Sequence, residues 1–489
     1  MLDPAATRRL PVVVAVMMSM FMVAIEATIV STAMPQIVSQ LGGLTLYSWV
    51  FSAFLLTQTA ATIIFGKLSD VYGRRPMMVA GIGIFIAGSV ACGLATSMLA
   101  LILFRLAQGV GAGAVQPIAQ TIIGDLYDAR ERGRVQALLA SVWASSAVLG
   151  PLVGAVIVAH VSWAWIFWIN IPFGIAAMIF FTRFLHEGVV RERKRIDVVG
   201  AVLFTIAVGA LMIALTESSS ARTDIVWGAA AIFVVAAILF VWQERRAAEP
   251  LVSFALWARR PIAAANGAAL LSGMALIGLT TFLPMFVQGV LQKPPIVAGL
   301  ALTAVMFGWP CGATLAVRIY RRYGLRAILV LGALLLPLGA FAFLTLRPGV
   351  SPLVAGLGSY IMGLGMGLFS SASIVMIQEI TTWSQRGSAT ASNVFSRNLG
   401  ITLGAAAFGA VLNHGLNASK TFGPITSEQL QRVIESTDTS ATSEALRGVL
   451  QAALHQTFLA MFIVSLMAVA VACLVPYVPM GRAEEQPAE

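Results

Sequence analysis

One carboxylate, Glu26, lies deep inside a long apolar segment. It is the only one of the 21 acidic residues in such a place, because the others lie at segment ends, in loops or in tails. An ionised side chain in the middle of a bilayer costs at least ~2.5 kcal/mol, so it is retained where it works or is paired. Arg105 lies in another apolar segment at a matching depth, since the two residues are about 12 and about 10 Å from the predicted outer ends of their helices. These two residue types can do proton chemistry: a buried acid can load and release a proton under the influence of a cation.

Two interpretations of Glu26 and Arg105 remain open at this point. In the first, burial favours the neutral acid and Arg105 favours the carboxylate, so that conformation and substrate decide when Glu26 carries a proton. In the second, the two form a static ion pair, or a hydrogen-bonded acid, that seals two helices together. Arg105 alone also suits a tether to backbone carbonyl groups.

The elements that hold these residues follow from composition. The chain has 489 residues, of which 58% are hydrophobic and 11% are charged, too apolar a balance for a soluble fold. A helix that crosses ~30 Å of hydrocarbon needs about 20 apolar residues. We therefore predict an all-α polytopic membrane protein with 14 spans, at 11–34, 47–66, 77–96, 98–122, 137–160, 165–184, 198–217, 224–242, 262–289, 296–317, 327–346, 352–377, 388–412 and 455–477.

Charge sets the expected orientation. With the N-terminus inside, most of the 31 lysines and arginines fall in inner loops. The sequence thus predicts a multi-pass protein of the cell (inner) membrane with both termini cytoplasmic. The net charge of +10 reports this topology and an affinity for anionic inner-leaflet lipid, and it requires no nucleic acid. The four histidines are scattered, at His160, His186, His414 and His455, so we expect no metal site, no cofactor and no enzyme active site.

The segment 66–76 (GKLSDVYGRRP) lies between two predicted spans and is charged and turn-forming. It resembles the cytoplasmic-loop signature G-x-L-x-D-x-x-G-R-[RK] of the major facilitator superfamily. The resemblance implies a conformational latch in which Asp70 and Arg74 engage the helix start near Ser388. The alternative is a well-capped turn that only sets topology. The charged loop 124–134 has two interpretations: it forms a similar charged network, or it is a solvated face. The signature residues are Gly66, Asp70, Gly73, Arg74 and Arg75.

A degraded copy of this loop lies near 317–326, where Gly324 aligns with Gly73 and Arg321 replaces the acid. The resemblance implies two six-helix bundles. Two extra spans then remain between them, so we predict three parts: an N-terminal six-helix bundle, two inserted helices with cytoplasmic linkers, and a C-terminal six-helix bundle. Their boundaries are 1–190, 191–260 and 261–489. The last part includes an outer loop, 413–454, that holds either short amphipathic helices or a tether.

Fourteen spans with an inserted pair resemble the drug/proton antiporter branch of the superfamily, of the QacA/EmrB type. The segment 24–35 (AIEATIVSTAMP) is similar to its [DE]-x-T-[IV]-V…A-[LM]-P pattern, and 105–113 (RLAQGVGAG) to its R-x-x-Q-G-x-G-x-[GA] pattern. The segment 162–172 (SWAWIFWINIP) is similar to S-W-R-W-I-F-x-I-N-x-P, with Ala164 where the branch has Arg.

The fifth predicted span carries a motif similar to the antiporter pattern G-P-x-x-G-G, whose small residues let helices approach closely. Its residues here are Gly150, Pro151 and Gly154.

Candidates for a lipophilic substrate cavity are aromatic and polar residues inside spans. For each of them, ordinary helix packing or an interfacial aromatic belt is the competing interpretation. Arg397 lies deep in its span, in a segment (FSRNLG) similar to F-x-R-Q-L-G, and is either a contact for an anionic or zwitterionic group or an internal charge partner. The full set is Trp49, Phe54, Gln58, Trp143, Phe282, Gln288, Trp309 and Arg397.

These patterns together predict a monomeric, proton-coupled secondary active exporter of small amphipathic or lipophilic compounds, of the multidrug-efflux type, that works by alternating access. Its expected partners are the substrate, protons and the lipid bilayer. The alternative is a facilitator or importer of a nutrient or lipid on the same fold.

Overall fold

The computed structural model describes residues 8–42, 46–187, 197–217, 223–247, 254–417 and 441–477, together with 250 and 252. Helices make up nearly all of this described part, and all but the short α6 and α10 are long. They are α1 (Arg9–Leu41), α2 (Tyr47–Tyr72), α3 (Arg74–Gly93), α4 (Met98–Leu126), α5 (Ala129–His160), α6 (Trp165–Trp168), α7 (Asn170–Phe184), α8 (Val198–Glu217), α9 (Thr223–Glu244), α10 (Phe254–Trp257), α11 (Arg260–Gly289), α12 (Pro295–Leu344), α13 (Pro352–Glu379), α14 (Trp383–Asn417) and α16 (Ala441–Cys473).

Among the described residues, 14 helical stretches are long and apolar enough to cross a membrane. This confirms the predicted fold class and span number. One helix, α12, contains two of the spans, Ile296–Tyr320 and Arg322–Leu344. They are separated by a break at Gly324, where φ is 79° and ψ is 161°. Glycine tolerates this left-handed φ because it has no Cβ.

The chain divides by its internal contacts into two compact units. Unit 1 takes in the described residues up to Ala263 together with Ile374–Phe395, and unit 2 takes in Ala264–Ser373 and Ser396–Tyr477. The short segment Ile374–Phe395, although it comes late in the sequence, therefore groups with the first unit. The three-part division at 190 and 260 stays a prediction, and most of the predicted outer loop 413–454 lies outside the described residues.

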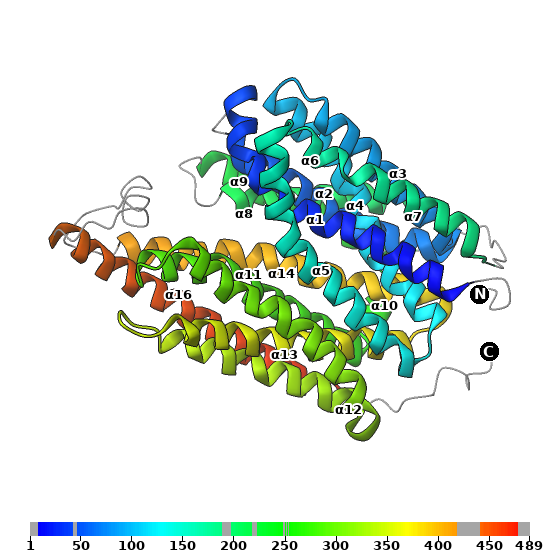
Figure 1. The fold of residues 1–489 in the computed structure, drawn as a ribbon. Helices are drawn as coiled ribbons and strands as arrows, with labels where there is room; N and C mark the ends of the chain where they lie inside the picture. The colour runs from blue at the N-terminus through cyan, green and yellow to red at the C-terminus, as the bar shows by residue number, and fades with distance from the viewer. Residues whose placement is uncertain are drawn as a thin grey trace. The chain divides into compact units, whose positions relative to one another are not determined.

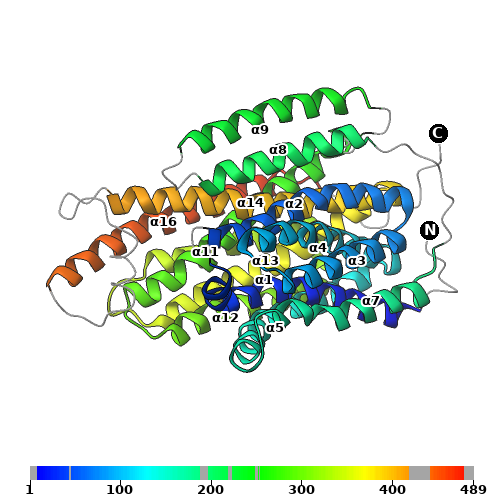
Figure 2. The same ribbon diagram turned by 90° about the horizontal axis from the view of Figure 1, so that it is seen from above.

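Unit 1 is built around α4, which packs along both α2 and α3, while α1 packs against α5 and α7 (Figure 1). Buried apolar side chains from these helices form its core, among them Met22, Phe85, Val115 and Phe181. The helices α8 and α9 pair with each other, and α8 contacts α2 (Figure 2). Unit 1 thus brings α1, α4 and α7 together, and these helices carry the candidate proton site.

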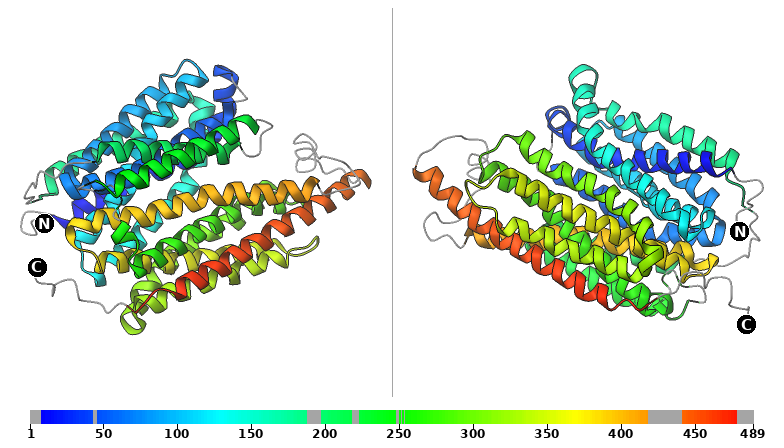
Figure 3. Two further views of the ribbon diagram at one scale, coloured as in Figure 1. Left: turned by 180° about the vertical axis from the view of Figure 1, so that it is seen from behind. Right: turned by 60° about the horizontal axis from the view of Figure 1, so that its bottom comes forward.

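Unit 2 has its own apolar core, in which Phe286 and Phe343 both pack on Phe458 of α16. The helix α16, orange to red in Figure 3, packs against α12. The phenylalanine cluster contributes to the association of these helices, because large aromatic side chains bury the most surface per residue.

Candidate functional site

The carboxylate of Glu26 and the guanidinium of Arg105 form an ion pair inside unit 1, between α1 and α4. Glu26 is 0% exposed and Arg105 is 2% exposed. Arg105 Nη1 donates to Glu26 Oε1 and, at 2.8 Å, to Gln108 Oε1. The structure therefore brings together the two residues that the sequence places at matching depths.

Arg105 is held in place from two further sides. Its Nε donates to the backbone oxygen of Val50 on α2 at 3.1 Å, and its guanidinium carbon lies 4.2 Å from the centre of the Phe54 ring. The cation is thus both a partner of Glu26 and a tether to a backbone carbonyl, so the two roles that the sequence left open coexist in one side chain.

Asn170 is the third member of this site, and sequence reasoning did not single it out. Its Nδ2 donates to the second carboxylate oxygen, Glu26 Oε2, at 2.7 Å. Its own Oδ1 is buried and has no hydrogen-bond partner among the described residues. A carboxylate needs donors and a carboxylic acid needs an acceptor, and a side-chain amide offers one of each. By turning its amide, Asn170 can therefore serve either protonation state of Glu26.

Gln108 extends the network away from Glu26. It accepts from Arg105 and donates through Nε2 to Ser89 Oγ on α3 at 2.9 Å. Gln108 is three residues after Arg105, so both side chains lie on one face of α4. A signal for Asn170 and Gln108 does exist in the sequence, because both are uncharged polar residues within the two segments 162–172 and 105–113 that resemble family motifs.

The antiporter-like motif packs α5 directly on the part of α1 that follows Glu26. A Cβ at Gly150 would lie 2.9 Å from Thr28 Cβ, and a Cβ at Gly154 would lie 2.9 Å from Ile29 Cγ1. Thr28 Oγ1 also donates to the backbone oxygen of Ser146 on α5 at 3.1 Å. The side chain of Pro151 lies outside the described part. The small residues thus permit an α1–α5 approach that larger ones would block.

A second charged cluster forms around the signature loop, also within unit 1. Asp70 at the end of α2 accepts hydrogen bonds from Gly387 N at 2.9 Å, Ser388 N at 2.7 Å and Ser388 Oγ at 2.8 Å. Arg74 Nη2 lies 2.9 Å from Asp70 Oδ1, and Gly73 between them has φ of 99°. The structure thus brings Asp70 to the first turns of α14, while the latch role stays a prediction.

Arg74 and its neighbours continue the cluster into α4. Arg74 Nε lies 3.2 Å from Asp125 Oδ2, and Arg386 Nη1 lies 2.7 Å from Asp125 Oδ1. Arg74 also donates to the backbone oxygen of Trp383 at 2.8 Å and lies over its ring. We call Asp70, Arg74, Asp125 and Arg386 the signature network; in it the charges alternate in sign, so each buried ion has an opposite neighbour.

A further pair, Arg132 and Glu379, lies beside the signature network. Arg132 Nη1 is 2.8 Å from Glu379 Oε1, and Arg132 Nη2 donates to the backbone oxygen of Gly124 at 2.7 Å. Sequence reasoning found the charged loop 124–134 but missed Glu379 and Arg386 as partners. Nothing in the local sequence of 379–388 indicates which distant helix its charges meet.

The start of α3 is closed by a carboxylate. Glu187 accepts from the backbone N of Arg74 at 2.8 Å and of Arg75 at 3.2 Å. Burial raises the pKa of Glu187 above its usual value, and the two N–H bonds oppose that rise. Arg75 itself donates to the backbone oxygen of Thr182 on α7 at 2.7 Å. Gly66, the first signature residue, meets Gly387 and Ala391 so closely that no Cβ fits there.

The proposed cavity residues of unit 1 have specific neighbours. Trp49 is half-buried and donates to Glu217 Oε1 at 3.1 Å. Phe54 lies under Arg105, and Gln58 is buried on α2. Trp143 packs against the unit 1 core. Phe54 thus belongs to the candidate proton site, and a substrate cavity lined by these four residues stays a prediction.

In unit 2, Phe282 and Trp309 belong to or pack on the core, and Phe282 meets Phe408 edge to face. Gln288 is partly buried near the end of α11. Arg397 is partly buried near the middle of α14, where a Cβ on Gly273 of α11 would touch its backbone oxygen. Among the described residues no ion pair or hydrogen bond of the Arg397 guanidinium is found.

The described residues thus hold 14 apolar stretches long enough to cross a membrane, and unit 1 contains a buried, ion-paired carboxylate, which together define a polytopic membrane protein. The chain belongs to the Major Facilitator Superfamily, whose family model matches residues 16–405. This confirms the predicted superfamily, and the superfamily is one of transporters and not of enzymes.

Relatives are consistent with this assignment. The multidrug transporter protein MdtP of Bacillus subtilis is 33% identical over 413 residues, which cover 83% of this chain and 76% of that protein. The multidrug resistance protein 3 of the same species is 34% identical over 404 residues, covering 82% and 79%. The MFS-type efflux pump MMF1 of Pseudozyma antarctica is 30% identical over 426 residues, covering 84% and 78%.

Solved structures match the fold. The human organic anion transporter MFSD10 superposes with a TM-score of 0.63 at 17% identity, covering 93% of this chain and 99% of that one. The proton:xylose symporter XylE superposes with a TM-score of 0.57 at 15% identity, covering 96% of each. At such identities the likeness concerns the fold alone.

Proposed function

We propose that this transporter is a proton-coupled exporter of small amphipathic or lipophilic compounds, of the fourteen-helix drug/proton antiporter branch. The observation that carries the proposal is Glu26: a fully buried carboxylate in α1, paired with Arg105 and bonded to Asn170. Burial favours the neutral acid at Glu26, whereas the Arg105 cation favours the carboxylate. A small movement of α4 or α7 relative to α1 therefore suffices to change whether Glu26 carries a proton. Relatives named multidrug transporters and an efflux pump support the export of drug-like molecules.

In this proposal the proton and the substrate alternate. When Glu26 is ionised, Arg105 and Asn170 hold it, and all three helices α1, α4 and α7 are drawn together. When Glu26 takes a proton, its attraction to Arg105 falls, and the cation retains Gln108 and the carbonyl of Val50. The loss of one ion pair therefore loosens α1 from α4 without leaving Arg105 uncompensated by hydrogen bonds.

Arg397 bears on the charge of the substrate. A mid-membrane cation without a charged partner in the described residues is costly, at least ~2.5 kcal/mol on insertion scales. A substrate with an anionic or zwitterionic group lowers that cost while it is bound. We therefore favour substrates with such a group over dications.

The test uses purified full-length protein in liposomes with an imposed pH difference. A pH-sensitive dye inside the vesicles records proton movement when lipophilic cations, neutral drugs, zwitterions or anions are added. At least one class should release protons in the wild type and none should in Glu26→Gln. Asp224→Asn is the matched control, because Asp224 is an exposed carboxylate in the first turn of α9.

Two results contradict the proposal. One is equal substrate flux with and without the pH difference, which indicates a facilitator. The other is net uptake of substrate that moves in the same direction as the protons, which indicates an importer. Folding of Glu26→Gln is checked by its elution on size exclusion, because the loss of the charge leaves Arg105 with fewer partners.

A further inference from the structure

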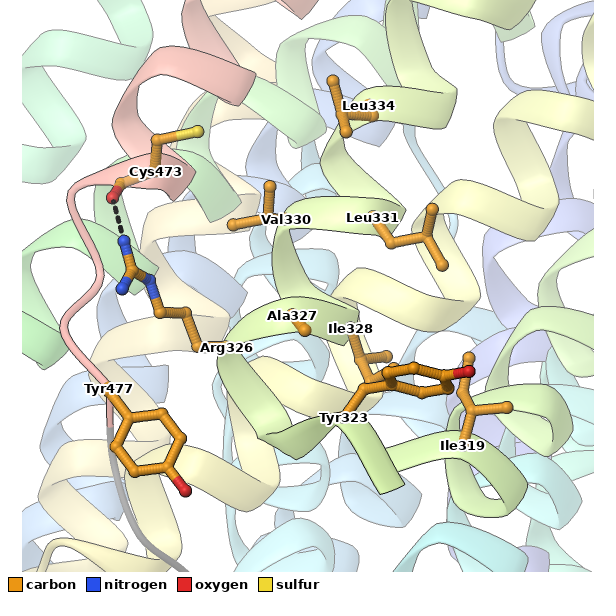
Figure 4. Close-up of a pocket in the computed structure, with 10 residues that line it drawn as sticks. All are labelled: Ile319, Tyr323, Arg326, Ala327, Ile328, Val330, Leu331, Leu334, Cys473 and Tyr477. Atoms are coloured by element: carbon orange, nitrogen blue, oxygen red, sulfur yellow. Dashed lines mark hydrogen bonds between the residues drawn. The ribbon is translucent and has the colours of Figure 1, made fainter. Parts of the chain in front are cut away.

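A surface groove of about 630 Å³ lies in unit 2, where the second span of α12 begins and α16 ends (Figure 4). Its wall is apolar and comes from consecutive turns of α12. Leu331 and Leu334 are 41% and 48% exposed, and Ile319 and Val330 complete the wall. Exposed leucines within a membrane span contact hydrocarbon, so this wall is suited to an acyl chain.

The other end of the groove is polar. Arg326, exposed on α12, donates to the backbone oxygen of Cys473 at 3.4 Å, and the rings of Tyr323 and Tyr477 flank it (Figure 4). Only one Nη of Arg326 donates to this carbonyl, so the other N–H groups of the guanidinium stay available for a ligand. Tyrosines with one apolar side and one hydroxyl are typical of the membrane interface.

No carboxylate in the described part of unit 2 lies near this cation. Within the described part of unit 2 the only acidic residue is Glu444, in the first turn of α16. Arg326 contacts the opposite end of that helix, about 40 Å away at ~1.5 Å per residue. Arg318 and Arg322 add positive charge on the same stretch of α12. The groove therefore has an excess of positive charge that the described residues of unit 2 do not compensate.

The corresponding turn in unit 1 has an acidic neighbour, which the turn at Gly324 lacks among the described residues of unit 2. Gly73 and Gly324 have nearly the same backbone conformation, with φ of 99° and 79°. Two residues later, Arg75 bonds the carbonyl of Thr182 near the end of α7, as Arg326 bonds that of Cys473 at the end of α16. In unit 1 the carboxylate of Glu187 accepts from the backbone N–H of this arginine, so an acidic group closes that turn. In unit 2 the described residues supply no such anion.

We propose that the groove binds an anionic phospholipid, whose phosphate lies beside the Arg326 guanidinium and supplies the negative charge that the described part of unit 2 lacks there. Arg326 donates to the phosphate oxygens, and one acyl chain lies along Leu331 and Leu334. The groove lies at the end of the span Arg322–Leu344, where lipid head groups meet hydrocarbon. Free phosphate has no apolar part that could pack on the leucine wall, whereas a phospholipid has both a phosphate and an acyl chain. The occupant we propose is therefore a lipid.

The experiment measures lipid binding to purified full-length protein by native mass spectrometry, with dioleoylphosphatidylglycerol and dioleoylphosphatidylcholine as probes. We expect phosphatidylglycerol to bind about tenfold more tightly than phosphatidylcholine, as one charge-assisted contact allows. Arg326→Gln should remove this preference and Arg326→Lys should keep most of it. The matched control is Arg347→Gln, because Arg347 is an exposed cation just beyond the other end of α12. A large excess of inorganic phosphate should not displace the lipid.

The location is tested in the wild type, so the result does not depend on whether Arg326→Gln folds. Phosphatidylglycerol with a photoreactive acyl chain should label peptides that contain Leu331 or Leu334. Labelling elsewhere, an unchanged preference in Arg326→Gln, an equal loss in Arg347→Gln, or displacement by phosphate alone would each overturn the proposal.

Discussion

Replacing Asp70 by Asn tests whether the signature network holds the start of α14. The carboxylate accepts three hydrogen bonds from Gly387 and Ser388 and pairs with Arg74, and its side chain is only 3% exposed. An asparagine keeps one acceptor oxygen, and its amide would face donors. Removing one partner of a buried ion pair costs about 3–5 kcal/mol. At about 1.4 kcal/mol per tenfold, local opening of this segment should become roughly 10² to 4 × 10³ times more frequent.

Hydrogen–deuterium exchange of the purified protein measures this opening directly. Peptides that cover 383–395 should exchange faster in Asp70→Asn, while peptides from α16 should not change. Glu131→Gln is the control: it removes an ion pair with Arg9 whose two side chains are 49% and 55% exposed. Exposed pairs contribute about 0–1 kcal/mol, so its effect should be at most about fivefold.

A double-mutant cycle separates the cap from general destabilisation. Ser388→Ala removes one of the three donors to Asp70, so its cost should be smaller in the Asp70→Asn background than in the wild type. The reasoning is refuted if exchange of 383–395 in Asp70→Asn stays within twofold of wild type. It is refuted equally if Glu131→Gln accelerates exchange as much.

Three more outcomes follow from the site. Asn170→Leu should lower proton-coupled transport by roughly tenfold or more, because it removes a charge-assisted hydrogen bond to Glu26, and Asn170→Ser should recover part of the rate in the same liposome assay. Gly150→Ala should destabilise the protein by about 1–3 kcal/mol in thermal unfolding, since its Cβ would crowd Thr28, whereas Gly228→Ala in open space should be neutral or stabilising. Arg397→Gln should reduce transport of anionic or zwitterionic substrates more than that of neutral ones, and an equal reduction of both would assign Arg397 to structure alone.

The sequence was sufficient for the elements and for the most unusual residues. Span number and fold class follow from length and hydropathy, because a bilayer imposes a fixed thickness on every helix. Glu26 and Arg105 stand out for the same reason: charges inside hydrocarbon are rare and costly, so each marks a place that needs explanation. Their common depth in the membrane could be predicted from residue numbers alone, because the rise per residue is constant along a helix.

The uncharged and loop-end partners were not predicted. Asn170 and Gln108 carry no charge, so their burial violates no strong rule until hydrogen bonds are known. Glu379 and Arg386 lie near helix ends, where charges are ordinarily solvated. Their pairing with Arg132 and Asp125 depends on contacts between segments about 250 residues apart, which no local pattern encodes.

The two glycine turns show why a repeat in sequence does not imply a repeat in chemistry. Gly73 and Gly324 impose the same left-handed backbone, which is set by the absence of a Cβ and is indifferent to neighbouring charge. The side chains around them are free to differ. Around Gly73, each cation named in the signature network meets a carboxylate, so that turn is electrostatically complete within unit 1. Around Gly324, Arg321 stands where Asp70 stands in the first turn, and the described part of unit 2 holds no nearby acid. The first turn can therefore hold a protein segment, whereas the second suits an external anion.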